Sequence, residues 1–410
     1  MLSVDEALKL VLDHAQPLDP VELTTSDAWT SEVLGCVLGE SVTADIDSPP
    51  HHKSIVDGYA INAADASATG AELTVIEEIT AGAIPTKSVG RGTATRIMTG
   101  APIPTGADAV VMVEQTALAG DRVRIQQSPI KPGQNIMRRA ASLARGQVVL
   151  PAGKTLRAVD VGLLAEVGRG RVKCIPRPLL AVIPTGNELV RLGETPGPGQ
   201  ICNTNGPLLR ALAESAGARA REFPIAGDNP EALRTLILMG FGSRIIVLSG
   251  GVSAGVLDLV PQVLRELGVE EVFHKVNLKP GKPLWFGVKR HREQNCQTLV
   301  FGLPGNPVSG LVCFELFVRP AIEKLSGREP KGLPRLAARL TKEHKQRGER
   351  QTYWPAVLTD DGGQQSVTPL PWQGSGDLRT LSDANALAVF RPGDRIFQPG
   401  EDVTVLLLKD

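Results

Sequence analysis

An uninterrupted apolar run, Ile245–Leu248, is followed by a loop of small residues and then by apolar residues at helical spacing. Such a run is typical of a short strand that is buried on both faces of a parallel sheet. The loop, residues 249–258, contains three glycines, which leave backbone N–H groups open to a ligand. Apolar residues recur on one helix face between positions 260 and 267. The pattern therefore predicts a strand, a glycine-rich loop and a helix.

The same succession of strand and small-residue loop occurs twice more. The apolar runs Leu179–Ile183 and Leu299–Phe301 each lead into a loop with proline and glycine. In parallel sheets, ligands bind outside the carboxyl ends of the strands. Two of the three loops carry a carboxylate, Glu188 and Asp258. We therefore predict one crevice that binds anions and a metal ion.

The N-terminal region has helical patterns. A capping box at Ser3–Glu6 predicts a helix through about His14. A second helix is predicted from about Ser26 to Leu38. Residues 1–44 are therefore interpreted as a helical arm, and the mixed helical and β pattern of residues 142–177 is expected to pack back against it.

The rest of the chain divides into regions that differ in the secondary structure their residue patterns predict. Short β-like runs separated by Gly and Pro predict an inserted all-β module over residues 45–141. Residues 178–328 hold the three strand–loop units and are predicted to form an α/β domain. An almost wholly apolar helix is expected after Asn306-Pro307, with a kink at Pro320. Residues 329–410 return to β-like runs, which predict a small C-terminal barrel or sandwich.

Composition narrows the class of protein. The chain has 410 residues, 42% of them hydrophobic and 21% charged, with a net charge of zero. This balance gives no electrostatic reason to expect nucleic acid or an anionic membrane as the main partner. We expect neither a signal peptide nor a membrane span. The five cysteines form no C-x-x-C pair, so we expect neither structural zinc nor a disulfide framework, and a reducing cytoplasm fits best.

Two lysines are held on one stiff turn. Lys279 and Lys282 lie in Asn277–Pro283, where two prolines restrict the backbone. Two ammonium groups that are held close repel each other unless an anion lies between them. The alternative is that both lysines point into water from an ordinary surface turn. The apolar residues Leu278 and Leu284–Phe286 on either side favour a partly buried turn.

Six motifs occur together in one known family, in the same order. They are Asp57-Gly58-Tyr59-Ala60, Thr99-Gly100-Ala101-Pro102, Thr185-Gly186-Asn187-Glu188-Leu189, Ser249-Gly250-Gly251-Val252-Ser253 with Gly255 and Asp258, Lys279-Pro280-Gly281-Lys282-Pro283, and Leu303-Pro304-Gly305-Asn306-Pro307-Val308-Ser309. Taken alone, the first two are interpreted as a turn and a loop. With all six in register over nearly the whole length, the chain resembles the MoeA-type molybdopterin molybdenumtransferases, the family of the gephyrin E domain.

The resemblance implies a multidomain fold of α/β plus β class. Its parts would be a Mog-like three-layer α/β molybdopterin-binding domain (178–328), an inserted β module (45–141), an elongated helical and mixed dimerisation arm (1–44 and 142–177) and a C-terminal β-barrel (329–410). The implied activity is the last step of molybdenum cofactor synthesis, in which a transferase inserts molybdate into adenylylated molybdopterin and releases AMP with Mg²⁺. The implied assembly is a homodimer in which the β module completes the partner's crevice. The molybdopterin adenylyltransferase is a further candidate partner.

The resemblance also assigns site residues. Catalytic roles would belong to Asp57, Asp258, Lys275 and Lys279. Adenylylated molybdopterin would bind Thr99, Thr185, Gly186, Ser249, Gly250, Gly251, Ser253, Pro304, Gly305 and Asn306. Molybdate would bind Lys279, Lys282, Arg350 and Ser375. The Mg²⁺ ligands would be Glu188, Asp228 and Asp258, which are hard oxygen ligands at loop ends.

Each carboxylate has a simpler interpretation. Asp258 and Asp228 could each cap the helix that follows, and Glu188 could be a solvated loop carboxylate. Three carboxylates at adjacent strand ends favour the metal site over these alternatives.

Two other functions are compatible with the fold. One is a non-catalytic dimeric scaffold, and the other is a molybdopterin adenylyltransferase. Retained carboxylates and lysines argue against the scaffold, since a scaffold has no need to keep buried charge. The additional β domains favour metal insertion. The chain departs from the family pattern at Pro355, at Ala141-Ser142 and around Asp377, and its preference for molybdate or tungstate stays open.

Overall fold

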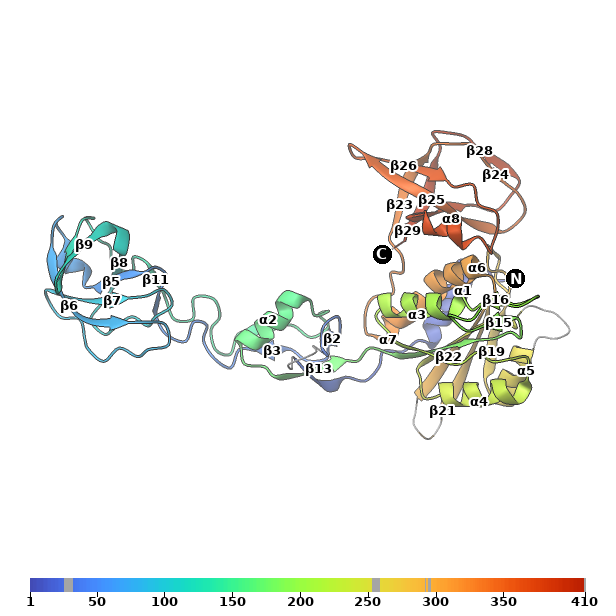
Figure 1. Ribbon diagram of the computed structural model, residues 1–410, viewed down its shortest axis with the longest axis horizontal. Helices are drawn as coiled ribbons and strands as arrows, with labels where there is room; N and C mark the ends of the chain where they lie inside the picture. Colours follow the sequence, from blue (N-terminus) through green and yellow to red (C-terminus); the bar gives the residue numbers. More distant parts are fainter. Residues whose placement is uncertain (26–31, 253–258, 292, 294–295, 409–410) are drawn as a thin grey trace. The chain divides into compact units, whose positions relative to one another are not determined.

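The computed structural model describes residues 1–25, 32–252, 259–291, 293 and 296–408. The chain forms two compact units (Figure 1). Unit 1 consists of Met1–Val21, Gly35–Val37 and Ile175–Asp410, and unit 2 of Glu22–Leu34 and Leu38–Cys174. No helix in the described ranges is long and apolar enough to cross a membrane. The predicted boundaries of the four domains stay a prediction.

Unit 1 contains a six-stranded sheet of order β17-β14-β18-β22-β21-β19. The strands are β14 (Leu179–Pro184), β17 (Arg219–Glu222), β18 (Ile245–Ser249), β19 (Glu270–His274), β21 (Trp285–His291) and β22 (Cys296–Leu303). The first four in the sheet are parallel, and β21 and β19 run antiparallel to their neighbours. The three predicted loop-bearing strands, β14, β18 and β22, are therefore adjacent, as expected.

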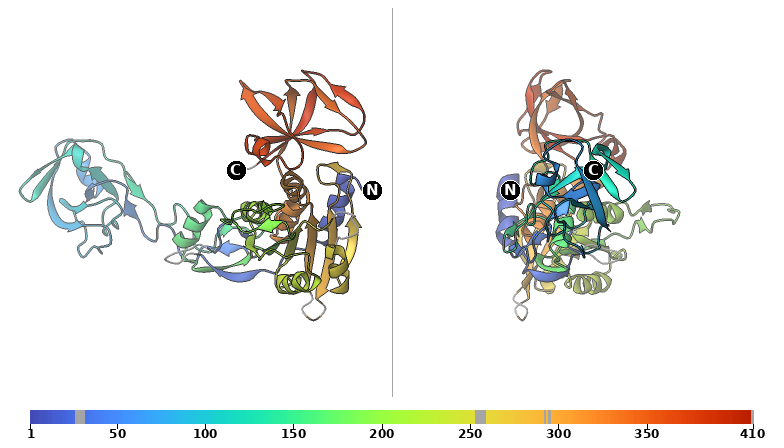
Figure 2. Two further views of the ribbon diagram at one scale, coloured as in Figure 1. Left: turned by 45° about the vertical axis from the view of Figure 1, so that its right-hand side comes forward. Right: turned by 90° about the vertical axis from the view of Figure 1, so that its left-hand side faces the viewer.

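Helices cover both faces of this sheet (Figures 1 and 2). Alternate strand residues face opposite sides, because side chains in a strand have a period of two. One face packs Leu180, Val182, Ile245 and Val247 against α3 (Asn205–Ser215) and the helices that follow β22. The other packs Ala181, Ile183, Ile246 and Leu248 against α4 (Pro230–Gly240) and α5 (Leu259–Glu266). Continuous apolar runs thus produce the three-layer α/β domain that the resemblance implied.

The first helix, α1 (Val4–His14), has the predicted capping box and packs in this same core. The Ser3 hydroxyl accepts a hydrogen bond from the Glu6 N–H at 3.2 Å, and the Glu6 carboxylate accepts from the Ser3 N–H at 2.8 Å. The Lys324 ammonium also donates to the Leu12 carbonyl at 2.7 Å.

The apolar helix after Asn306 is built in three parts. They are α6 (Pro307–Cys313), a π-helical segment (Phe314–Val318) and α7 (Arg319–Leu325). The irregularity therefore lies before Pro320 and not at it. Pro320 falls in the first turn of α7, where its missing N–H is tolerated, and the preceding turn widens instead.

The C-terminal region of unit 1 is a closed five-stranded barrel. Its strands follow the order β25-β26-β23-β29-β27, and β27 pairs back with β25. They are β23 (Arg335–Leu340), β25 (Gln351–Asp361), β26 (Gln364–Pro369), β27 (Ala386–Phe390) and β29 (Asp402–Leu407). The short helix α8 (Leu378–Ser382) precedes β27, and β24 (His344–Gln346) pairs with β28 (Arg395–Phe397). Of the two predicted forms, barrel or sandwich, the barrel is present.

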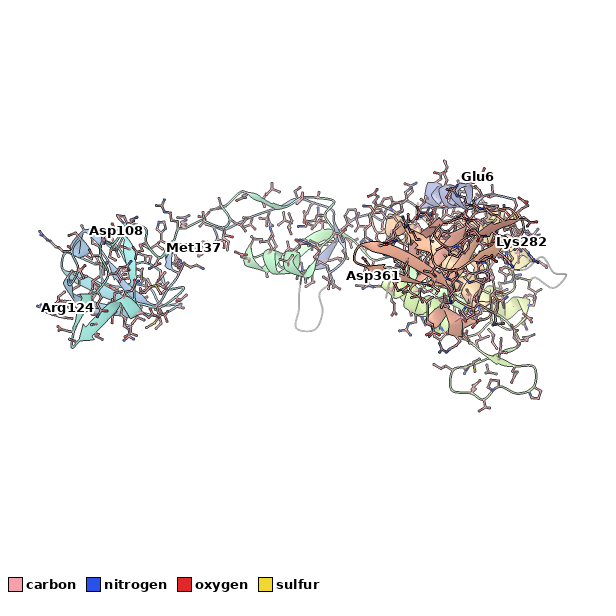
Figure 3. The ribbon with its side chains drawn as sticks, turned by 90° about the horizontal axis from the view of Figure 1, so that it is seen from above. Glu6, Asp108, Arg124, Met137, Lys282 and Asp361 are labelled. Atoms are coloured by element: carbon pink, nitrogen blue, oxygen red, sulfur yellow. The ribbon has the colours of Figure 1, made fainter. Side chains whose placement is uncertain are left out.

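Unit 2 contains the predicted β module. Its six-stranded sheet has the order β8-β5-β7-β6-β10-β9. The strands are β5 (Gly58–Ile61), β6 (Glu72–Ile79), β7 (Thr93–Ile97), β8 (Ala109–Met112), β9 (Thr116–Ala119) and β10 (Arg122–Ile125). Asp108, labelled in Figure 3, accepts a hydrogen bond from the Ala63 N–H at 2.7 Å, which fixes the short 3₁₀ helix after β5.

The remainder of unit 2 pairs segments far apart in the sequence. Its elements are β1 (Val21–Thr24), β2 (Val37–Leu38), β3 (Val42–Thr43), β4 (Lys53–Ser54), β11 (Ile136–Met137), β12 (Val148–Leu150), α2 (Ala158–Glu166) and β13 (Arg171–Ile175). One terminal residue of each of β1, β2 and β13 is counted in unit 1. The predicted helix from Ser26 to Leu38 is wrong at its C-terminal end, because β2 pairs with β13 and Gly35 has a left-handed φ of 78°. Its positions 26–31 lie outside the described residues.

Candidate functional site

The loops after β14, β18 and β22 are joined by backbone hydrogen bonds. The Thr185 N–H donates to the Ser249 carbonyl at 2.9 Å, and the Gly250 N–H donates to the Leu303 carbonyl at 3.0 Å. Gly250 has a φ of 99°, and a Cβ there would lie 2.7 Å from the Thr185 carbonyl oxygen. Only glycine therefore allows the loops to meet this closely.

These loops form one wall of a cavity of about 690 Å³ in unit 1. Predicted site residues line it from both the α/β domain and the barrel: Thr185, Glu188, Ser249, Lys279, Lys282, Pro304, Gly305, Asn306, Arg350 and Ser375. Its volume falls in the range of small-molecule sites, roughly 300–1,000 Å³. Strands separated by more than a hundred positions thus supply one concave surface.

Strand pairing brings two of the cationic side chains together. The short strand β20 (Leu278–Lys279) pairs with the start of β25, so that Lys279 lies opposite Thr352, two residues from Arg350. In the following turn Gly281 has a φ of 118°, and a Cβ there would approach the Cys313 sulfur to 2.5 Å. The turn is therefore packed against α6, as the flanking apolar residues predicted.

The cavity has an excess of positive charge. Lys279 and Arg350 are half-buried, and Lys282, labelled in Figure 3, is exposed. None of the three forms an ion pair with a residue that the structure describes. Glu188 is the only carboxylate on the described lining. Unpaired cations that share a partly enclosed space are stabilised by an anion, so this cavity suits an anionic ligand.

A hydrogen bond joins the two domains at the cavity. The Asn306 amide nitrogen donates to the Ser375 hydroxyl at 2.8 Å, and the Val308 N–H donates to the Ser375 carbonyl at 3.1 Å. Asn205 connects the other loops, because its amide nitrogen donates to the Ser249 hydroxyl at 2.7 Å and to the Gly305 carbonyl at 2.6 Å. The lining is thus held by specific polar contacts.

Known proteins match this chain along its whole length. Three domain families match: MoeA N-terminal region (domain I and II) over residues 2–168, Probable molybdopterin binding domain over 181–324, and MoeA C-terminal region (domain IV) over 337–408. A protein of a Nostoc species named molybdopterin molybdenumtransferase is 36% identical over 100% of this chain and 94% of its own length. One of the same name from Staphylococcus epidermidis is 32% identical over 99% and 95%. The chain belongs to the MoeA family.

A solved member of the family has the same fold. The crystal structure of a molybdopterin biosynthesis MoeA protein from Pyrococcus horikoshii has a TM-score of 0.79 at 31% identity, with 100% of both chains covered. These matches confirm the resemblance that the six motifs indicated. They also confirm the Mog-like α/β domain and the C-terminal β-barrel that it implied.

Seven described residues that the MoeA resemblance assigned lie outside the lining of the cavity: Gly186, Gly250, Gly251 and Lys275 in the α/β domain, and Asp228, Asp57 and Thr99, which are treated below. Gly186, Gly250 and Gly251 shape the loops behind it, all with positive φ. Lys275 also has a positive φ, 77°, which is rare for a residue with a side chain. Such backbone strain is concentrated at functional positions in proteins, but the catalytic role of Lys275 stays a prediction.

The carboxylates expected to bind Mg²⁺ are only partly described. Glu188 lines the cavity, and Asp228 does not, although its N–H donates to Asn187 of the same loop at 2.9 Å. The cap of α4 is Asn229, whose side chain accepts from Glu231 and Ala232, so Asp228 is not the capping residue. Asp258 and Ser253 lie outside the described residues, and the part of the chain described contains no group of three possible metal ligands. The metal site stays a prediction.

Asp57 and Thr99 contact each other in unit 2. The Thr99 N–H and hydroxyl both donate to one Asp57 carboxylate oxygen at 2.7 Å. These two hydrogen bonds, first that of the hydroxyl, lower the pKa of the exposed Asp57 carboxyl. The two motifs therefore form one local feature of the β module, and their part in a crevice stays a prediction.

Sequence reasoning missed several lining residues. Asn205, Trp354, Trp372 and Gln373 line the cavity but were not assigned to the site. Asn205 opens α3, Trp354 lies in β25, and Trp372 lies in the segment after β26. Only the side-by-side placement of the two domains turns these positions into a wall.

Proposed function

We propose that this protein inserts molybdate into adenylylated molybdopterin and releases AMP, the final step of molybdenum cofactor synthesis. The relatives are named molybdopterin molybdenumtransferases. The observation that carries the proposal is the cavity with three unpaired cations beside the strand-end loops. Both substrates are anions, and the cavity offers positive charge and hydrogen-bond donors to each.

Residue roles follow from the chemistry of the lining. Molybdate, a compact dianion, would be held by Lys279, Lys282 and Arg350 with the Ser375 hydroxyl. The hydroxyls of Thr185 and Ser249, with the backbone of Gly305, would hold the pterin and its phosphates. When water attacks the phosphoanhydride, a new P–O bond forms at the pterin phosphate and the old one breaks, which leaves negative charge on the released AMP. Fixed cations lower the barrier by stabilising that charge.

We further propose that Mg²⁺ binds through carboxylates at this edge of the sheet. Glu188 fits, because it is a hard oxygen donor on the wall of an anion-binding cavity. Asp228 and Asp258 are the other proposed ligands. A bound divalent ion would supply positive charge to a phosphate oxygen.

The metal proposal is tested by Asp258→Asn. The amide keeps the shape but removes the charge, so turnover should lose its dependence on added Mg²⁺ and fall to background. Normal turnover together with lower stability in thermal unfolding would mean that Asp258 caps a helix.

The proposed activity is tested with purified protein and adenylylated molybdopterin. We expect AMP release that depends on added molybdate, measured by chromatography. A non-catalytic scaffold would release none. An adenylyltransferase would instead form adenylylated molybdopterin from molybdopterin and ATP, and this reaction without molybdate-dependent AMP release would contradict the proposal.

A further inference from the structure

Two tryptophans form an aromatic wall on the barrel side of the cavity. Trp354 lies in β25, and Trp372 lies in the segment between β26 and α8. Their ring centroids are 4.9 Å apart and the rings are nearly perpendicular, at 87°. Both are half-buried and both line the cavity. We call this pair the aromatic wall.

Residues of the barrel fix the orientation of the Trp354 ring. The Trp354 indole N–H donates to the Leu370 carbonyl at 2.8 Å, which fixes the plane of the ring. His344 contacts the same ring edge-on at 4.7 Å, and His344 itself stacks on Phe390 at 3.6 Å. A ring so restrained loses little entropy when a flat ligand packs on it.

Neither packing of the protein core nor binding of molybdate explains why two tryptophans line this cavity. The chain has only four tryptophans, and two of them contribute to this one cavity. Trp354 packs only at the margin of the barrel core, and Trp372 only at the margin of the α/β core, so neither ring is enclosed by its core. The cations explain why anions bind, but a phosphate or molybdate gains little from an indole. The exposed face of an indole in an anion-binding cavity fits a ligand with a planar ring attached to a phosphate.

We propose that the purine ring of the adenylyl group stacks on the face of one indole of the aromatic wall, with the perpendicular indole beside it. This inference rests on the proposed function, which supplies the nucleotide. Adenine is planar and fully aromatic, and bases stack on tryptophan in proteins that bind nucleic acid strands. Its phosphate would then lie toward Thr185, Ser249 and Gly305 of the same lining. Trp354 and Trp372 thereby become specificity-determining residues for the nucleotide half of the substrate.

The test compares two ligands that differ by the base alone. AMP and ribose 5-phosphate share the ribose and the phosphate, so the ratio of their dissociation constants isolates the contribution of the base. Calorimetry should show tighter binding of AMP to the unchanged protein. In at least one of the variants Trp372→Leu and Trp354→Leu the affinity for AMP should fall by about five- to a hundredfold, the effect of losing one stacked base. The affinity for ribose 5-phosphate should stay within about twofold in both variants.

Matched variants control for folding. Trp372→Phe keeps an aromatic face and should retain most of the preference for AMP. Trp285→Phe changes a fully buried tryptophan in the α/β sheet and should leave the preference unchanged. If the leucine variants do not fold, quenching of tryptophan fluorescence in the unchanged protein by AMP, and not by ribose 5-phosphate, tests the same claim.

Several results would overturn the inference. They are an unchanged AMP affinity in both leucine variants, an equal loss of both ligands, or equal quenching by the two. Failure of the proposed function is a separate observation, since it is the absence of molybdate-dependent AMP release by the unchanged protein. An active enzyme whose tryptophan variants bind both ligands normally would reject the stacking alone.

Discussion

At the scale of single residues, the pKa of His344 in the barrel depends on burial and on the charge of Lys279 at the cavity. Its side chain is buried, and its Nε2 atom has no hydrogen-bond partner in the described structure. Burial, and next the charge of Lys279, lower the pKa of His344 from 6.5 to about 4. The neutral imidazole therefore favours the folded state fully above pH 6.5, and this contribution is lost as the pH falls toward 4.

His344→Phe should remove this pH dependence. Phenylalanine keeps the stack on Phe390 and cannot be protonated. The lowered pKa corresponds to roughly 3 kcal/mol between pH 6.5 and pH 4, so the variant should lose less free energy of unfolding than the unchanged protein over this interval by up to that amount. Urea unfolding at several pH values measures the difference. Parallel curves for the two proteins would show that His344 does not titrate as described.

At the scale of elements, the start of α2 depends on one carboxylate. Asp160 is buried, and its oxygens accept from the Lys154 ammonium at 2.7 Å and the Arg157 N–H at 2.9 Å. Burial alone would raise the pKa of Asp160, but these hydrogen bonds outweigh it and lower the pKa to about 2. The carboxylate thus stabilises the fold above its usual pKa of 3.8, and this contribution is lost as the pH falls toward 2.

Asp160→Asn should lower the free energy of unfolding of unit 2 by about 2 kcal/mol at pH 7, the value of a charge-assisted hydrogen bond. The difference from the unchanged protein should shrink below pH 3.8, where protonation begins to neutralise the carboxylate in the unfolded chain. Glu22→Gln is the control, because Glu22 and Arg171 form an exposed ion pair of little expected weight. Equal effects of the two substitutions at pH 7 would contradict this account.

Elements with a clear pattern of apolar residues were predictable from the sequence. Elements held only by pairing with a segment far away in the sequence were not. The buried strands β14, β18 and β22 follow from unbroken apolar runs, and their shared edge follows from parallel pairing. The strand β2 was missed because its two residues carry no period and are held by β13. The aromatic wall was missed for a similar reason, since Trp372 joins the cavity only when the barrel packs beside the α/β domain.

At the scale of the whole molecule, we propose a homodimer in which the crevice is shared between chains, as the resemblance to the family implies. Asp57 belongs to unit 2, whereas the cavity and its loops belong to unit 1. If the partner supplies Asp57, mixing inactive Asp57→Ala and Asp258→Ala subunits should restore part of the turnover. One crevice of the mixed dimer would then carry both defects and the other neither. No recovery, in subunits shown to exchange, would place both residues in the site of one chain.

The central claim is that the cavity binds molybdate between its unpaired cations, and a molybdate titration of AMP release tests it most directly. Lys279→Ala and Lys282→Ala each remove a charge-assisted hydrogen bond of about 1.5–3 kcal/mol, which corresponds to about ten- to a hundredfold in affinity. Lys345→Ala, which removes an exposed lysine paired with Glu343 in the same barrel, is the control. We expect half-saturation to rise by that factor in the first two variants, with normal binding of adenylylated molybdopterin. Loss of that binding with unchanged molybdate saturation would contradict the account, because the lysines would then hold phosphate.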